Sequence, residues 1–142
     1  NRHLEKNHPN ESIKTCNCEN VLPEFGKYCY KAACYQTTRE LAKRLNLPKE
    51  KYSVSFQSRL SNNWMTPFTD KTLIDLAKKG NKKILVTAPA FVSDCLETTV
   101  EIGFEYKEMF IENGGENLQM VGSLNDSPRW INALEEILEP YL

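Results

Sequence analysis

The sequence predicts an α/β layer fold built on a parallel sheet. Segments with helical spacing alternate with short segments of strand length, and the connections between them are short, as is typical of helices packed on a parallel sheet. Residues 83–88 form a largely apolar run without alternation, which predicts a strand covered on both faces. Only three strands can be recognised, so we expect the chain to be part of a larger fold.

The predicted elements follow from local signals. They are helices at 34–45, between Thr69 and Gly80, at 93–113 and from 128 onward, and strands at 52–56, 83–88 and 118–121. Thr69 and Ser127 are candidate N-caps, and Pro128 suits a first helical position. Gly80 and Gly114 are candidate stops for the helices that precede them.

The length, charge balance and apolar content of the chain exclude several classes of protein. The chain has 142 residues with 18 basic and 19 acidic side chains, and this balance gives no basic surface for nucleic acid. No apolar stretch approaches the roughly 20 residues that span a bilayer, although peripheral contact with a membrane remains open. The sequence begins without Met and without the apolar core of a signal peptide. We therefore expect a cytoplasmic protein, and a chain cut from a longer one.

Four of the five cysteines fall close together, at Cys16, Cys18, Cys29 and Cys34. The chain from Asn1 to about Lys31 shows no sustained strand or helix period, whereas the pattern becomes regular from Ala32 onward. We therefore predict a cysteine-rich metal-binding segment at 1–34, followed by an α/β domain at 35–142. Four thiolates suit a structural Zn²⁺ or a [2Fe–2S] cluster. Disulfides and free cysteines in a loop are the alternatives.

Two segments that leave predicted strands carry unusual polar and aromatic residues. In open α/β sheets, ligands bind beyond the carboxyl ends of the strands, so these segments are where a site is expected. Segment 56–67 contains Arg59 and Trp64, and segment 89–98 contains Phe91, Cys95 and Glu97.

The same two segments resemble signatures of the ferrochelatase family. Phe56-Gln57-Ser58-Arg59 is followed by Trp-x-x-Pro-x-Thr, and the second segment has the form Pro-x-Phe-x-x-Asp-Cys-x-Glu-Thr. Gly114-Gly115 and Leu124-Asn125-Asp126-Ser127 match the family as well, so the resemblance runs from about residue 35 to the end. It implies two similar Rossmann-like halves, each a three-layer αβα arrangement, with a porphyrin held between them. This chain would be the C-terminal half.

The resemblance also implies an activity, the insertion of ferrous iron into a porphyrin. Glu97 matches the carboxylate that faces the porphyrin centre, where an acid/base group can take up pyrrole protons and meet the substrate iron. Trp64 and Phe91 match aromatic positions that line the macrocycle. Cys95 falls where other members carry His, and Arg59 is assigned to the porphyrin pocket.

Without the resemblance, each of these residues has a simpler interpretation. Glu97 is then a favourable acidic residue at a helix start, and Trp64 and Phe91 are core aromatics. Cys95 is a small buried hydrophobic residue, and Arg59 caps neighbouring carbonyls.

Two departures from the family pattern set limits. The family's catalytic histidine belongs to a Ser-x-His-Gly strand end that would lie just before this chain, and neither His3 nor His8 replaces it. The first half-domain is absent as well, so the expected partners are a porphyrin, Fe(II) and an N-terminal half-domain. The chain alone is not expected to insert iron.

Three points stay open at this level. The cysteine spacing resembles a four-cysteine segment that carries [2Fe–2S] in some bacterial members of the family, so iron–sulfur is favoured over zinc. A non-catalytic metal- or porphyrin-binding module is the alternative function. Protoporphyrin IX and coproporphyrin III both remain candidates for the substrate.

Overall fold

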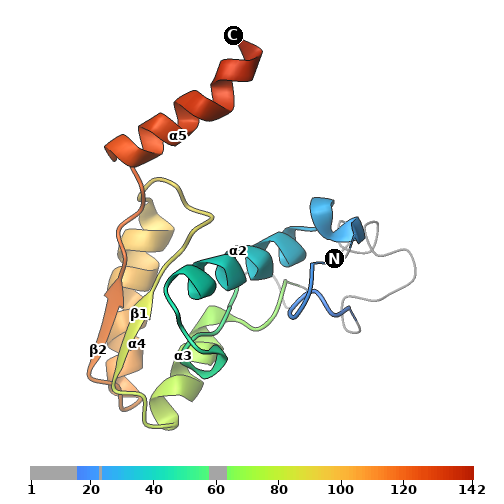
Figure 1. Cartoon of the computed structure of the whole chain (residues 1–142). Coiled ribbons are helices and arrows are strands. Elements are labelled where there is room, and N and C mark those ends of the chain that lie inside the picture. The colour runs from blue at the N-terminus through green and yellow to red at the C-terminus, as the bar shows by residue number, and fades with distance from the viewer. Residues whose placement is uncertain (1–15, 23, 58–63) are drawn as a thin grey trace. The chain divides into compact units, whose positions relative to one another are not determined.

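The computed structural model describes residues 16–22, 24–57 and 64–142. The chain divides into two compact units, residues 1–72 and 73–142, and each is described by itself. The elements (Figure 1) are η1 Glu24–Tyr28, α2 Tyr30–Arg44, η2 Lys49–Lys51, α3 Thr69–Lys78, β1 Lys83–Val86, η3 Glu97–Glu105, α4 Tyr106–Glu112, β2 Asn117–Met120, α5 Pro128–Leu138 and η4 Glu139–Tyr141.

Helix α2 is the main element of the first unit and confirms the helix predicted at 34–45, although it begins earlier, at Tyr30. Its buried side includes Ala32, Tyr35 and Ala42. The Tyr35 ring packs edge-on against the Phe56 ring, with the ring centroids 6.1 Å apart. An aromatic pair of this geometry stabilises the fold beyond the area that it buries.

The strand predicted at 52–56 is wrong, because this segment makes only one bridge, a parallel pairing of Phe56 with Phe68. The Phe56 N–H donates to the Pro67 carbonyl at 2.9 Å, and the Thr69 N–H donates to the Phe56 carbonyl at 3.2 Å. The pairing cannot extend backward because Pro67 has no N–H to donate. It cannot extend forward because α3 begins at Thr69.

The second unit contains a parallel pair of strands, which confirms the strands predicted near 84 and 119. Strands β1 and β2 pair in register from Lys83 opposite Asn117 to Val86 opposite Met120. Elements α4 and η3 pack along β2 (Figure 1). The core of this unit consists of Leu73, Ala77, Ile102, Phe110 and Leu118.

The two faces of β1 differ in burial. Ile84 and Val86 pack on the core, whereas the Leu85 side chain between them is 67% exposed. Alternate residues of a strand point to opposite faces, so the face of the sheet that carries Leu85 is open among the described residues. The chain is therefore an α/β protein with a small parallel sheet, and the second covering layer stays a prediction.

The helix predicted at 93–113 is divided into two parts. A π-helix, η3, begins at Glu97, and α4 continues from Tyr106. The helix begins later than predicted, and the N–H groups of Asp94 and Cys95 before it are capped by the side chains of Asn125 and Thr98. Gly114, with φ +104°, follows α4, and Gly80, with φ +87°, follows α3, which confirms both predicted stops.

Helix α5 begins at Pro128 as predicted, with Ser127 at the N-cap position but without a side-chain cap. The Ser127 carbonyl instead accepts the Trp130 N–H at 2.9 Å. Several apolar side chains of α5 are exposed, including Ile131, Ile137 and Leu138. Among the described residues, no helix has the length and apolarity needed to cross a membrane.

Candidate active site and cysteine cluster

The loop that leaves the carboxyl end of β1 is joined to the loop that leaves β2. Two residues, Asp94 and Asn125, make this connection although they are 31 positions apart. The Asp94 N–H donates to Asn125 Oδ1 at 2.9 Å, and Asn125 Nδ2 donates to Asp94 Oδ2 at 2.8 Å. The Ser123 N–H donates to Asp94 Oδ1 at 3.0 Å, and the Asn125 N–H donates to the Val92 carbonyl at 2.9 Å.

These donors change the acidity of Asp94. The Asn125 side chain, followed by the Ser123 N–H, holds the pKa of the Asp94 carboxyl below its usual value of 3.8. A carboxyl with a lowered pKa in the folded state stabilises the fold above its unfolded pKa, and this contribution disappears as the pH falls through the folded pKa.

We therefore expect Asp94→Asn to lower the Tm of the chain at pH 7, because an amide would present N–H groups to the Asn125 amide. The difference in Tm between the wild type and this variant should narrow below pH 4. Thermal melts followed by circular dichroism at several pH values measure both effects. Asp126→Asn, on an exposed neighbour, is the matched control. A gap in Tm that stays constant down to pH 2 would contradict the role of the Asp94 charge.

Glu97 is the first residue of η3 and lies next to the Cys95 thiol. Its own backbone N–H, followed by a hydrogen bond from Cys95, lowers the pKa of the Glu97 carboxyl. The turn before it is fixed by Thr98, whose fully buried hydroxyl accepts the Cys95 N–H at 2.9 Å and donates to the Cys95 carbonyl at 3.0 Å. An ionised carboxylate in this position can accept a proton or attract a divalent cation.

The remaining predicted porphyrin residues are distributed as follows. Phe91 is half-buried in the same loop, where its N–H donates to the Ala88 carbonyl at 2.9 Å. Trp64 belongs to the first unit, and its indole N–H donates to the Gln57 carbonyl at 2.9 Å. Arg59, like His3 and His8, lies outside the described residues. The structure thus brings Cys95 and Glu97 together, with Phe91 on the same loop.

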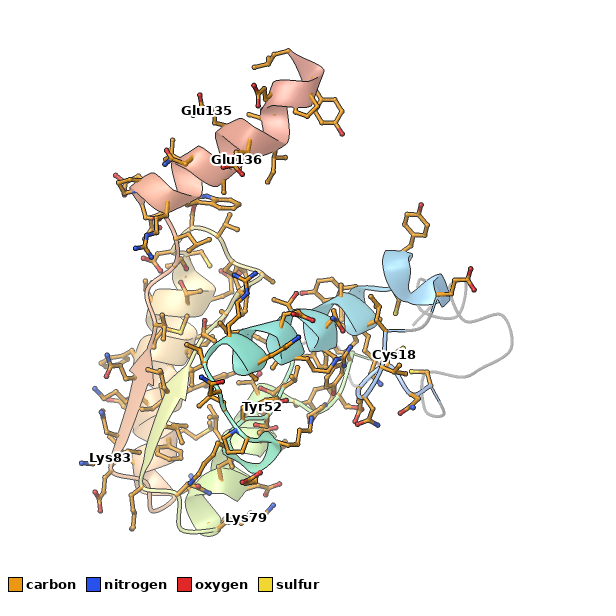
Figure 2. All side chains as sticks on the ribbon, in the orientation of Figure 1. Cys18, Tyr52, Lys79, Lys83, Glu135 and Glu136 are labelled. Atoms are coloured by element: carbon orange, nitrogen blue, oxygen red, sulfur yellow. The ribbon has the colours of Figure 1, made fainter. Side chains whose placement is uncertain are left out.

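Three of the four clustered cysteines meet in the first unit. Cys18 and Cys29 are buried together with Ala32, and Cys16 packs against them. Figure 2 labels Cys18 beside the N-terminal part of α2. Burial, followed by the neighbouring thiols of Cys16 and Cys29, raises the pKa of Cys18 to about 12. Hence the Cys18 thiol is protonated at neutral pH in the metal-free protein.

The fourth cysteine of the group has a different main contact. The hydroxyl of Tyr30 forms a hydrogen bond with the Cys34 thiol, and burial raises the pKa of Cys34 despite this bond. Cys29 is close enough to contribute to the same rise. None of the five cysteines, all in the described part of the chain, is in a disulfide.

The cysteines have the right chemistry for a soft metal ion but are not arranged around one. Four thiols in one neighbourhood are the donors that zinc and iron–sulfur clusters use. Within the described ranges, however, no three His, Cys, Asp or Glu side chains are placed to hold a metal ion.

Two cations of α2 contact the segment that carries Cys16 and Cys18. The Lys31 side chain is only 8% exposed, and its ammonium lies 3.8 Å from the Cys16 sulfur and 3.5 Å from the Glu19 carboxylate. The Arg39 guanidinium donates to the backbone carbonyls of Cys18 and Glu19, at 3.1 and 2.8 Å. The segment is therefore held against the helix by two side-chain contacts and by two backbone contacts.

Comparison with known proteins identifies the family. The model of the ferrochelatase family matches residues 8–142, which is nearly the whole chain. The chain belongs to the ferrochelatase family. Similar members are the ferrochelatases of Pseudomonas fluorescens biotype C, 45% identical over 97% of this chain, and of Coxiella burnetii strain Dugway 5J108-111, 43% identical over 99% of it. The ferrochelatase of Pseudomonas aeruginosa strain LESB58 is 43% identical over 96% of this chain.

The chain spans only about two fifths of the length of these ferrochelatases. It covers 42% of the Pseudomonas fluorescens protein, 40% of the Coxiella burnetii protein and 41% of the Pseudomonas aeruginosa protein. The similarity to these ferrochelatases therefore covers only one part of their length.

Sequence reasoning missed two parts of this ferrochelatase segment, the Asp94–Asn125 connection and the Lys31–Cys16 contact. The first had a usable signal, because polar residues that follow two neighbouring parallel strands come together at one edge of the sheet. The second had none, since a lysine on a helix is ordinarily exposed.

Proposed function

We propose that this chain is part of an enzyme that inserts ferrous iron into a porphyrin, the reaction of haem biosynthesis. The observation that carries the proposal is the position of the Glu97 carboxylate, which stands beside the Cys95 thiol at the start of η3. It follows the carboxyl end of a parallel strand, where α/β proteins bind their ligands. Family membership supports the same conclusion.

Each residue of the proposed site has a role in this reaction. Metal insertion releases the pyrrole protons of the macrocycle as iron binds the ring nitrogens, and Glu97 is the group that accepts protons and attracts Fe(II). Phe91 and Trp64 offer apolar faces to the flat ring. Cys95 donates to Glu97 and contributes to the lowered pKa of its carboxyl, and Arg59 is proposed to bind the porphyrin. The porphyrin is protoporphyrin IX or coproporphyrin III.

The rest of the proposed enzyme has to supply what this segment does not. We assign residues 35–142 to the C-terminal half of a two-domain chelatase, a three-layer Rossmann-like unit, and residues 1–34 to a metal-binding segment. An N-terminal half-domain would provide the catalytic histidine and the opposite wall of the porphyrin site. We also propose that the enzyme is cytoplasmic and that it can contact a membrane surface peripherally.

Porphyrin binding by the full-length enzyme that contains this segment tests the assignment. Phe91→Ala and Trp64→Ala should each weaken porphyrin binding by roughly 10–100-fold, since each removes the burial of one aromatic side chain. Absorbance and fluorescence titration of the porphyrin gives the Kd. Tyr141→Ala, at an aromatic residue that is 85% exposed, is the control.

Two results would count against this assignment. If the Phe91 variant bound porphyrin as tightly as the Tyr141 variant, the loop would not belong to the pocket. If the wild-type enzyme converted no porphyrin to its iron complex under anaerobic conditions with Fe(II), the proposed activity itself would fail.

We further propose that Cys16, Cys18, Cys29 and Cys34 bind a thiophilic metal centre, with [2Fe–2S] favoured and Zn²⁺ as the alternative. The contact between the buried thiols of Cys18 and Cys29 and the half-buried Cys16 supports this second function. The metal would order a segment that has few other core residues, since metal binding free energy contributes to folding.

Substitution of single cysteines distinguishes this centre from free thiols. We expect the chain purified anaerobically to carry iron and sulfide or zinc, and Cys18→Ser to lose most of that metal, because a buried thiolate ligand is removed. Elemental analysis and visible absorbance report the loss. Cys95→Ser, in the other unit, should keep the metal. Equal metal contents in the two variants would contradict the assignment of Cys18.

A further inference from the structure

Thr98 is a fully buried polar residue next to the proposed acid/base group. It is 0% exposed, and it follows Glu97 directly at the start of η3. Threonines are mostly exposed in folded proteins, and burying a hydroxyl is unfavourable unless the hydroxyl is hydrogen-bonded. The partners of the Thr98 hydroxyl therefore indicate what this residue does.

Both partners belong to one residue, Cys95. The Thr98 hydroxyl accepts the Cys95 N–H at 2.9 Å and donates to the Cys95 carbonyl at 3.0 Å. A side chain that reaches back three positions to a backbone N–H at the start of a helix forms half of a capping box. Here the same oxygen also bonds the carbonyl, so the peptide groups on both sides of the Cys95 Cα atom are held.

Holding these two peptide groups also sets the direction of the Cys95 side chain, because the Cα–Cβ bond has a fixed direction relative to the backbone. The Cys95 thiol in turn donates a hydrogen bond to the Glu97 carboxylate. The χ1 angle of a β-branched residue such as threonine is stiff, so the Thr98 hydroxyl is itself well fixed. A path of contacts therefore runs from the buried hydroxyl through Cys95 to the carboxylate.

The neighbouring hydroxyl, on Thr99, makes a different contact. It donates to the Cys95 carbonyl at 2.8 Å, as hydroxyls in helices do to the carbonyl four residues earlier. Thr99 is exposed, however, and the Cys95 N–H donates to Thr98. Of these two threonines, only Thr98 is buried and bonds both backbone groups of Cys95.

We propose that Thr98 is a positioning residue of the metallation reaction, which directs the Cys95 thiol toward the Glu97 carboxylate and so holds that carboxylate in its catalytic direction. The inference rests on the proposed function and adds a residue that acts through Cys95 and not on the substrate. A misplacement of about 1 Å can lower a rate about 10²-fold. The loss of the Thr98 hydroxyl should therefore affect turnover more than porphyrin binding.

Steady-state metallation by the full-length enzyme, measured well below the Tm of each variant, tests this role. Thr98→Val keeps the shape of the side chain and removes the hydroxyl, so it should lower kcat by about 10–100-fold and leave the KM for porphyrin little changed. Thr98→Ser keeps the hydroxyl and should restore most of kcat. Thr99→Val, the matched control, should keep nearly the kcat of the wild type. An equal fall in kcat for Thr98→Val and Thr99→Val would overturn the proposal.

Cys95→Ala separates positioning through the thiol from a merely structural cap. This variant removes the thiol and leaves the backbone groups that Thr98 bonds, and it should itself lower kcat. In the Cys95→Ala background, Thr98→Val should lower kcat much less than it does in the wild type, because the two residues act along one path. A wild-type kcat for Cys95→Ala would overturn the proposal, even if Thr98→Val fails to fold.

The same assay distinguishes this inference from the proposed function. A wild-type enzyme that metallates no porphyrin with Fe(II) under anaerobic conditions would overturn the proposed function and with it the role of Thr98. An active wild type and a folded, equally active Thr98→Val variant would overturn only the role of Thr98.

Discussion

Replacing Glu97 by Gln in the full-length enzyme is expected to lower kcat for porphyrin metallation by about 10²–10⁴-fold, the usual contribution of a positioned acid/base group. The amide keeps the size of the side chain but can neither accept a proton nor attract Fe(II). Porphyrin affinity should change little, because the proposed apolar contacts of Phe91 and Trp64 are left intact. The rate is measured anaerobically from the change in the visible absorption bands of the porphyrin.

Glu105→Gln provides the control for this experiment. Glu105 is the last residue of η3 and is exposed, so its replacement removes the same charge from the same helix at the opposite end. We expect its metallation rate to equal that of the wild type. Similar rates for the two variants would show that the position of Glu97 carries no special function.

The largest effect on stability is expected from Phe110→Ala, which should lower the free energy of unfolding by about 3–5 kcal/mol. Phe110 is completely buried and belongs to the core cluster of the second unit with Ile102 and Leu118. Its removal leaves a cavity between α4 and the sheet. Urea denaturation of the chain measures the loss. Phe104→Ala, at a phenylalanine that is 59% exposed, should change the free energy by less than about 0.5 kcal/mol.

Gly115 offers an independent check on the same packing. A Cβ atom built at Gly115 would overlap the Phe110 ring, so Gly115→Ala should also destabilise the chain, by roughly 1–3 kcal/mol. The combined Phe110→Ala, Gly115→Ala variant should then lose less than the sum of the two, because the added methyl group enters the space that the ring has left. Strict additivity would contradict this contact.

Features that depend on neighbouring residues were predicted well from the sequence. The spacing of Leu41 and Leu45 predicted helix α2, and the stops at Gly80 and Gly114 follow from the tolerance of glycine for positive φ. No strand forms at 52–56, because the segment that pairs with it contains Pro67, more than ten positions away, and Pro67 has no N–H to donate. Local alternation carries no information about that partner.

Within the candidate site, contacts between near neighbours in the sequence also differ from contacts between distant residues. Cys95 and Glu97 are close in sequence, so their contact could be anticipated. Asn125 joins Asp94 across 31 positions, and Lys31 meets Cys16 across 15. These contacts depend on how strands pair and on which side of α2 is buried, which single-residue preferences do not determine. The aromatic residues Phe91 and Trp64 remain predictions as porphyrin contacts.

The direction in which the Glu97 side chain points depends on the number of residues in the π-helical segment η3. Its turns are wider than those of an α-helix, and it runs without a break into α4, where Phe110 is fixed in the core. One residue of an α-helix corresponds to about 100° of rotation. Deleting one residue from Glu97–Glu105 would therefore swing the carboxylate around the helix axis while the anchor stays in place. The same deletion would turn the buried side chains of Thr98 and Ile102 out of the core, so the number of residues in η3 sets the direction of the carboxylate and the packing of this unit together.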